Sequence, residues 1–186
     1  MELDEAIVGR RATREYTKQT VDDATVEQLI AAGVHAPSAV NQQPWVFTVV
    51  RNQVILDLIS RDAKSHVIAT TPAPIPADHV HGRLNDADFH IFYHAPVLIL
   101  ISASSPGPWI VEDCALAAQN LMLTAYGSGL GSCWIGLAQS FLNTTAGKKI
   151  LDLPTAWIPV APIIVGHPRV KPAAVRRNEP VVRWVN

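Results

Sequence analysis

The alternation of hydrophobic and polar positions predicts helices and short strands along the whole chain. Apolar residues at helical spacing indicate helices over residues 3–10, 26–35, 54–59, 109–126 and 144–151. Runs rich in β-branched and aromatic residues indicate strands over residues 45–50, 97–101, 132–135 and 160–165. Because helices alternate with buried strands, the pattern favours an α+β or α/β three-layer sandwich.

Three further segments complete this outline. In the first predicted helix, Leu3, Ala6 and Ile7 follow helical spacing, so we expect Arg10 to project from the inner face near the helix end. Residues 69–82 are rich in proline, lack periodicity and are predicted to form a loop or lid. From residue 168 onward we expect an extended basic arm. Its apolar residues would anchor the arm on the protein surface.

The composition is typical of a compact enzyme. The chain has 186 residues, of which 48% are hydrophobic and 17% are charged, and this length fits a single domain over residues 1–186. The N-terminus lacks the basic start of a signal peptide, and the apolar runs are too short to span a membrane. A formal net charge of -1 argues against general nucleic-acid binding. We therefore expect a cytoplasmic protein that has neither a membrane nor a nucleic acid as its partner.

The distribution of charge and of cysteine adds to this picture. Nine of the 15 Lys and Arg residues lie in the first 18 and last 18 positions, so two basic ends could converge on one anionic group. Cys114 and Cys133 imply no disulfide framework and are expected to be buried thiols.

A short bend places four polar side chains between Pro37 and Pro44. The two prolines restrain the bend, which follows a predicted helix and precedes a predicted strand. The amides of Asn41 and Gln42 offer donors and acceptors that could read the edge of a planar heterocycle. The alternative is a turn whose side chains cap local backbone groups, an interpretation that fits Ser38 well.

Basic and glycine-rich segments lie on either side of this bend in the sequence. Arg10 and Arg14 are four residues apart and would share a face if the helix continued, although in isolation a solvated basic helix end, which needs no ligand, is the favoured explanation. Glycines at 127, 129 and 131 invite a dinucleotide-binding interpretation. Ser132 stands where the G-x-G-x-x-G fingerprint requires its last glycine, so we reject a Rossmann site.

Taken in order, the segment Arg10–Arg14, the bend and the segment Gly129–Gly136 resemble the nitroreductase family of FMN-dependent oxidoreductases. The resemblance extends over nearly the whole chain. It implies an α+β nitroreductase-like fold with a mixed sheet flanked by helices. It also implies a homodimer with FMN at the subunit interface and an exchanged C-terminal arm.

The resemblance also implies which residues bind the cofactor. The phosphate and the ring would be held by basic residues near both ends, by the bend of the partner subunit and by the strand after the glycines. The implied FMN-binding residues are Arg10, Arg11, Arg14, Pro37, Ser38, Ala39, Asn41, Gln42, Trp134, Ile135, Gly136, Arg176 and Arg177. The chain departs from many relatives at Ala12, where they have a serine, and at Leu137, where they have a second glycine.

The implied activity is the reduction of nitroaromatics, quinones or similar electrophiles, with NADH or NADPH as electron donor and hydride transfer through flavin N5. No catalytic side chain is required, because the flavin performs the redox chemistry. Alternatives are reductive dehalogenation, a flavin-modifying reaction or FMN binding without turnover. Residues 69–89 would form the substrate lid. His90 and His94 have i, i+4 spacing but are interpreted as packing residues, so no metal is expected.

Overall fold

The computed structural model describes residues 2–71 and 81–185. Most of the predicted lid, residues 72–80, therefore lies outside the described residues. Elsewhere the predicted order of helices and strands is confirmed, although four of the nine predicted elements are longer in the structure and two are shorter.

A four-stranded sheet forms the middle of the molecule. Its strands are β1 (Trp45–Val50), β2 (Val97–Ala103), β3 (Gly131–Trp134) and β4 (Ile158–Gly166), in the spatial order β1-β2-β4-β3. Every neighbouring pair among these strands is antiparallel. The expectation of a mixed sheet is corrected in this respect, because helices lie between the strands in sequence but return the chain in the opposite direction. Among the described residues, parallel pairing is confined to an isolated bridge.

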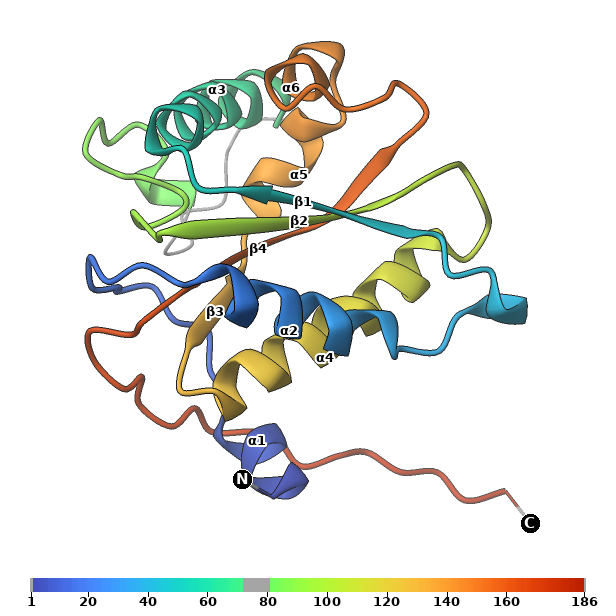
Figure 1. Ribbon diagram of the computed structural model, residues 1–186. Helices are drawn as coiled ribbons and strands as arrows, with labels where there is room; N and C mark the ends of the chain where they lie inside the picture. Colours follow the sequence, from blue (N-terminus) through green and yellow to red (C-terminus); the bar gives the residue numbers. More distant parts are fainter. Residues whose placement is uncertain (1, 72–80, 186) are drawn as a thin grey trace.

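Helices cover both faces of the sheet, so the predicted three-layer sandwich is confirmed (Figure 1). On one face lie α2 (Asp23–Val34) and α4 (Ile110–Gly127), which pack against each other. On the other face lie α3 (Gln53–Thr70), α5 (Gly136–Leu142) and α6 (Thr145–Ile150). Each of the helices α2, α3 and α6 is preceded by an N-cap residue whose side chain accepts a backbone N–H.

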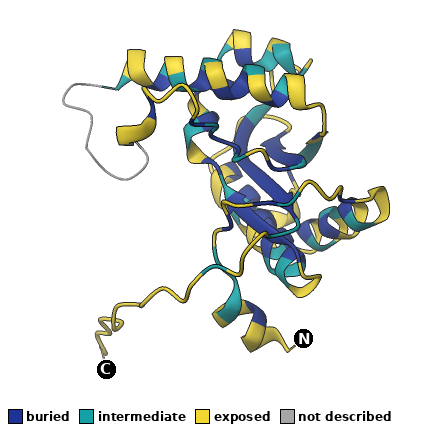
Figure 2. Cartoon of the chain, turned by 90° about the vertical axis from the view of Figure 1, so that its left-hand side faces the viewer, coloured by how far each residue is buried: buried dark blue, intermediate teal, exposed yellow. Residues whose placement is uncertain are grey.

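The core lies on both sides of the two central strands. All residues of β2 are buried, as are those of β4 after Ile158. Figure 2 shows these buried strands in the middle, beneath helices that expose their outer faces. A strand covered on both faces must be apolar throughout, which explains the uninterrupted runs in the sequence.

The first helix differs from its prediction. α1 (Leu3–Gly9) is shorter, and Leu3 and Ile7 are 67% and 51% exposed, so of the three apolar residues at helical spacing only Ala6 is buried in this chain. The close approach of α1 to the domain is at its C-terminal end. A Cβ on Gly9 would lie 2.2 Å from the hydroxyl of Tyr126 on α4, so the close contact needs glycine there. Apolar surface on α1 is left uncovered.

The sequence also missed α5, a helix of two turns that begins directly after β3 at Gly136. Its buried residues Ala138, Phe141 and Leu142 attach it to the face of the sheet that α3 also covers. In the described part of the chain, no helix combines the length and the apolar character needed to cross a membrane.

Candidate functional site

The residues after α1 form an extended segment that runs beside β3. Ala12 pairs with Ser132 in a parallel bridge, and the Thr13 N–H donates to the Ser132 carbonyl over 3.0 Å. Thr13 is buried against the strand, and a Cβ added at Gly131 would lie 2.5 Å from Thr13 Oγ1. Gly131, in the segment Gly129–Gly136, therefore has a packing reason: it allows the basic N-terminal segment to lie against β3.

This segment carries two arginines to the same region. Arg10 and Arg14 do not share a helix face, because α1 ends at Gly9 and the chain beyond it is extended. Burial raises the pKa of the Cys133 thiol on β3, and the charges of Arg14 and then Arg10 oppose that rise. Both guanidinium groups thus act on the same point of β3.

Three buried polar atoms in this region have no hydrogen-bond partner among the described residues, namely Arg10 Nε, Arg11 Nε and Ser132 Oγ. Leaving such a group unsatisfied costs about 1–3 kcal/mol. A ligand that brings hydrogen-bond acceptors would remove this cost. The unpaired atoms therefore favour an anionic or oxygen-rich ligand beside β3.

A cavity of about 140 Å³ opens where β3 ends. It is lined by Arg14, Ile91, Tyr93, Cys133, Trp134, Ile135, Gly136 and Leu137. A Cβ added at Gly136 would meet no atom within 4 Å, so the backbone is open on that side. The structure thus brings together one predicted arginine, Arg14, and the predicted backbone segment from Trp134 to Gly136.

Arg11 has a different role from its neighbours. Its Nη1 donates to the carbonyl groups of Val8 and Arg10, so it caps the C-terminal end of α1. Arg11 also lines a second cavity, of about 280 Å³, together with Lys171 from the arm. Sequence reasoning did not single out Lys171. Its signal was its position only a few residues after β4, where the arm still lies close to the domain.

The bend between α2 and β1 is strained. Val40, Asn41 and Gln43 have φ values of 45°, 57° and 48°, a region that side chains disfavour, especially a β-branched one such as valine. The Ser38 hydroxyl accepts the Gln43 N–H over 2.9 Å, so local capping does occur. Strain of this kind costs about 1–3 kcal/mol per residue and clusters at functional sites.

The bend lies apart from the cavity in this chain. In Figure 1 it follows α2 at the edge of the molecule, far from β3 and α1. The N–H of Ala39 donates to Asp113 Oδ1 near the start of α4 over 2.9 Å, which fixes the bend there. Pro37, Asn41 and Gln42 are exposed. One copy of the chain therefore does not bring these predicted site residues to Arg14.

The C-terminal arm is also separate. It passes α1 and then runs away from the domain (Figures 1 and 2). Arg176 and Arg177 are exposed, and neither lines the cavities described above. Trp184, which we expected to dock, is 84% exposed. Large apolar side chains along a solvated arm are unusual, because their burial is favourable by about 1.5–3 kcal/mol each.

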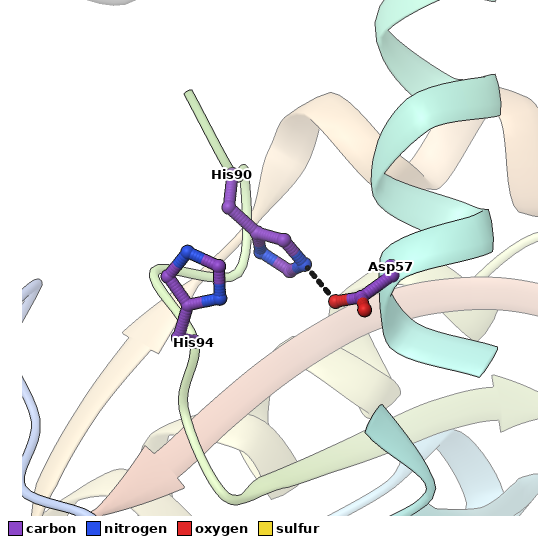
Figure 3. A group of neighbouring side chains, drawn as sticks. All are labelled: Asp57, His90 and His94. Carbon is purple, nitrogen blue, oxygen red and sulfur yellow. Dashed lines mark hydrogen bonds and ion pairs between the residues drawn. The ribbon is translucent and has the colours of Figure 1, made fainter. Parts of the chain in front are cut away.

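Three side chains, Asp57 from α3 and His90 and His94 from the segment before β2, lie close together (Figure 3). Their possible ligand atoms lie within 4.8 Å of one another. Both nitrogens of His90 are engaged: Nε2 lies 3.1 Å from Asp57 Oδ1, and Nδ1 accepts the Phe92 N–H over 3.1 Å. A metal at Nε2 would move the ring proton to Nδ1, against that N–H. The arrangement favours a structural role. Sequence reasoning missed Asp57, which α3 supplies.

Comparison with known proteins places the chain in a family. The model of the nitroreductase family matches residues 7–167, so this chain belongs to the nitroreductase family.

Individual relatives agree with this assignment. A protein of Methanothermobacter thermautotrophicus, provisionally named NADH dehydrogenase/NAD(P)H nitroreductase, is 30% identical over 177 residues, 92% of this chain and 80% of the relative. The 5,6-dimethylbenzimidazole synthase of Rhodospirillum rubrum is 28% identical over 183 residues, 90% of this chain and 82% of the relative. A crystal structure of a nitroreductase with bound FMN from Bacteroides fragilis has a TM-score of 0.82 at 25% identity and covers all of both chains. The predicted α+β nitroreductase-like fold is thereby confirmed.

Proposed function

We propose that this protein is an FMN-dependent oxidoreductase that uses NADH or NADPH to reduce nitroaromatics, quinones or similar electrophilic acceptors. One observation carries the proposal: Arg14 lies beside the open backbone of Trp134, Ile135 and Gly136 in one cavity. Family membership and the FMN bound in the related Bacteroides fragilis structure agree with it.

The residues of this chain fit the cofactor. Arg10 has an unpaired buried Nε that can donate to a phosphate or ribityl oxygen, and Ser132 Oγ is unpaired nearby. Arg14 supplies a fixed cation at the cavity, where it would stabilise negative charge on a reduced ring. Gly136 leaves room for a planar group to approach the backbone closely.

The reaction places few demands on side chains. FMN, when bound, supplies the hydride-transfer chemistry between nicotinamide and acceptor. The protein orients the two substrates, provides positive charge and excludes water with the apolar walls that Ile91, Ile135 and Leu137 contribute. This division of labour accounts for the absence of a paired general acid and base from the lining of the cavity that the described residues form.

We infer that a second copy of the chain completes the site. The bend from Pro37 to Gln42 is strained, exposed and remote from the cavity of its own chain, and the arm exposes Trp184 and Val185. A homodimer would satisfy both features if the bend reached the partner's flavin and the arm covered the partner's apolar surface. Arg176 and Arg177 would then approach the cofactor only in the dimer.

The first test is the visible spectrum of the purified protein, followed by anaerobic titration with NADH and with NADPH. We expect a flavin spectrum that either nicotinamide bleaches and that menadione or a nitrofuran restores. Protein that stays colourless when FMN is supplied, or bound FMN that neither nicotinamide reduces, would overturn the proposal. Loss of FMN with formation of a new product would instead indicate a flavin-modifying reaction.

A further inference from the structure

The turn that leads into β2 holds two residues in a disfavoured conformation. Tyr93 and His94 have φ values of 51° and 52°, in the left-handed region. The turn is closed by backbone hydrogen bonds from the Tyr93 N–H to the His90 carbonyl over 2.9 Å and from the Ala95 N–H to the Phe92 carbonyl over 3.0 Å. Non-glycine residues adopt this conformation in succession only where the surroundings impose it.

Helix α3 is the element that imposes it. Asp57, Ser60 and Lys64 are spaced three and four apart, so they share one face of the helix. Ser60, which is buried, accepts the Ile91 N–H over 3.0 Å, and Lys64 Nζ donates to the Phe89 carbonyl over 2.7 Å. One helix face thus fixes the chain leading into the turn.

Asp57 acts through His90, as Figure 3 shows. Because His90 Nδ1 accepts the Phe92 N–H, the ring hydrogen lies on Nε2 and is donated to Asp57 Oδ1 over 3.1 Å. His90 is neutral in this arrangement, and a protonated ring could no longer accept the Phe92 N–H. The imidazole is therefore a rigid link between α3 and the residue that precedes Tyr93.

The result of this support is the position of Tyr93. Its ring packs edge-on against Phe89, with centroids 5.8 Å apart, and it lines the cavity that Arg14 and Gly136 also line. Burial raises the pKa of the Tyr93 phenol, and the charge of Arg14 opposes part of that rise. A phenol beside a guanidinium turns its oxygen lone pairs toward the cation, so its hydrogen is free to donate elsewhere.

We propose that Tyr93 is a second hydrogen-bond donor, beside Arg14, to the carbonyl edge of the bound flavin, and that α3 positions it through His90. The inference rests on the proposed function, because it takes the cavity for the flavin site. A donor at this edge stabilises the negative charge that the ring acquires on reduction more than it stabilises the oxidised ring. Tyr93 therefore raises the reduction potential of the cofactor, and it keeps its own proton throughout.

The test is the two-electron reduction potential of the bound FMN, measured by equilibration with a reference dye. Tyr93→Phe removes the hydroxyl and keeps the ring, and we expect it to shift the reduction equilibrium about tenfold toward the oxidised form, or about 30 mV. His94→Asn is the matched control in the same strained turn, and we expect it to leave the potential unchanged.

The positioning role of His90 has its own comparison. In His90→Asn, the side-chain oxygen can stand in for Nδ1 and accept the Phe92 N–H, whereas His90→Leu offers no acceptor. We expect the leucine variant to lower the potential and the asparagine variant, which replaces Nδ1 but not Nε2, to restore part of it. Combined with Tyr93→Phe, the leucine variant should lower the potential no further, because both changes act on the same hydroxyl.

The outcomes separate the two levels of the proposal. Wild-type protein that binds no FMN would remove the proposed function itself. Wild-type protein with bound, reducible FMN, together with an unchanged potential in Tyr93→Phe, would refute the role of Tyr93 alone. An unchanged potential with weaker use of nitro and quinone acceptors would also refute it, and would assign the hydroxyl to the acceptor instead.

Discussion

Replacing Gly136 with alanine separates the needs of the fold from the needs of the cofactor. Gly136 begins α5 and lines the cavity, and an added Cβ would meet no protein atom within 4 Å. A methyl group at this position would therefore not clash with the rest of the protein. Alanine is favoured over glycine in helices by about 0.5–1 kcal/mol, so the free energy of unfolding should stay the same or rise.

The bound cofactor would be affected differently. If the flavin ring lies against the backbone at Gly136, the new methyl group occupies the space that the ring needs. Forcing an extra methyl group into a well-packed contact costs about 1–3 kcal/mol, which corresponds to roughly 5- to 150-fold weaker FMN binding.

Gly127 provides the matched control. It ends α4, a Cβ there would also meet no atom within 4 Å, and it lines none of the cavities described above. Both variants should melt at or slightly above the wild-type temperature in the absence of FMN, since about 1 kcal/mol corresponds to roughly 2–4 °C in a chain of this size. FMN titration by fluorescence quenching should show weaker binding for Gly136→Ala alone. Wild-type affinity in Gly136→Ala would show that no ring approaches this backbone.

Four further outcomes are expected. Arg10→Ala should lower FMN affinity roughly tenfold or more, because a hydrogen bond to a charged group contributes about 1.5–3 kcal/mol. Arg61→Ala, on the exposed face of α3, should leave the FMN affinity from fluorescence titration unchanged. Truncation before Val175 should release FMN and convert the dimer to monomer in analytical ultracentrifugation; a truncated protein that remains dimeric and yellow would contradict the role of the arm. Burial lowers the pKa of His90 below its ordinary value of 6.5, so between the pKa of the folded state and that of the unfolded state the unfolded chain binds more protons. The free energy of unfolding from urea titrations should therefore rise with pH up to about 6.5 and level off above it. A His90→Asn variant with the same slope would exclude His90 as the cause. Burial, followed by the neighbouring Asp113, raises the pKa of Cys114 to about 12, so this thiol should not react with a thiol-specific dye at pH 8 until the protein is unfolded.

Several features could be predicted from local sequence because local rules decide them. The uninterrupted apolar run from Val97 to Ile101 could only be a strand covered on both faces, and it is the fully buried β2. Pro37 and Pro44 marked a restrained bend, and the structure shows strained backbone between them. The cluster Arg10–Arg14 and the segment before Gly136 were recognised as parts of one site, and the structure brings Arg14 to that segment.

Other features depend on contacts between distant residues. The sequence could not show that Leu3 and Ile7 stay exposed, because this follows from how Gly9 meets Tyr126 on a helix more than 100 residues away. Helical spacing predicted that Arg10 and Arg14 lie together on one face of a helix. In the structure the helix ends at Gly9, and the segment carrying both arginines is extended and pairs with β3 instead.

Taken alone, the sequence determined the order of the elements, the buried strands and the residue types available for an anionic, planar cofactor, because periodicity and local backbone restraints are written in neighbouring residues. Only the tertiary structure decided which of those residues meet. It placed Tyr93 beside Arg14 through side chains of α3, and it kept the Pro37–Gln42 bend away from the cavity of its own chain. Such meetings depend on the packing of elements far apart in sequence, which no local pattern encodes.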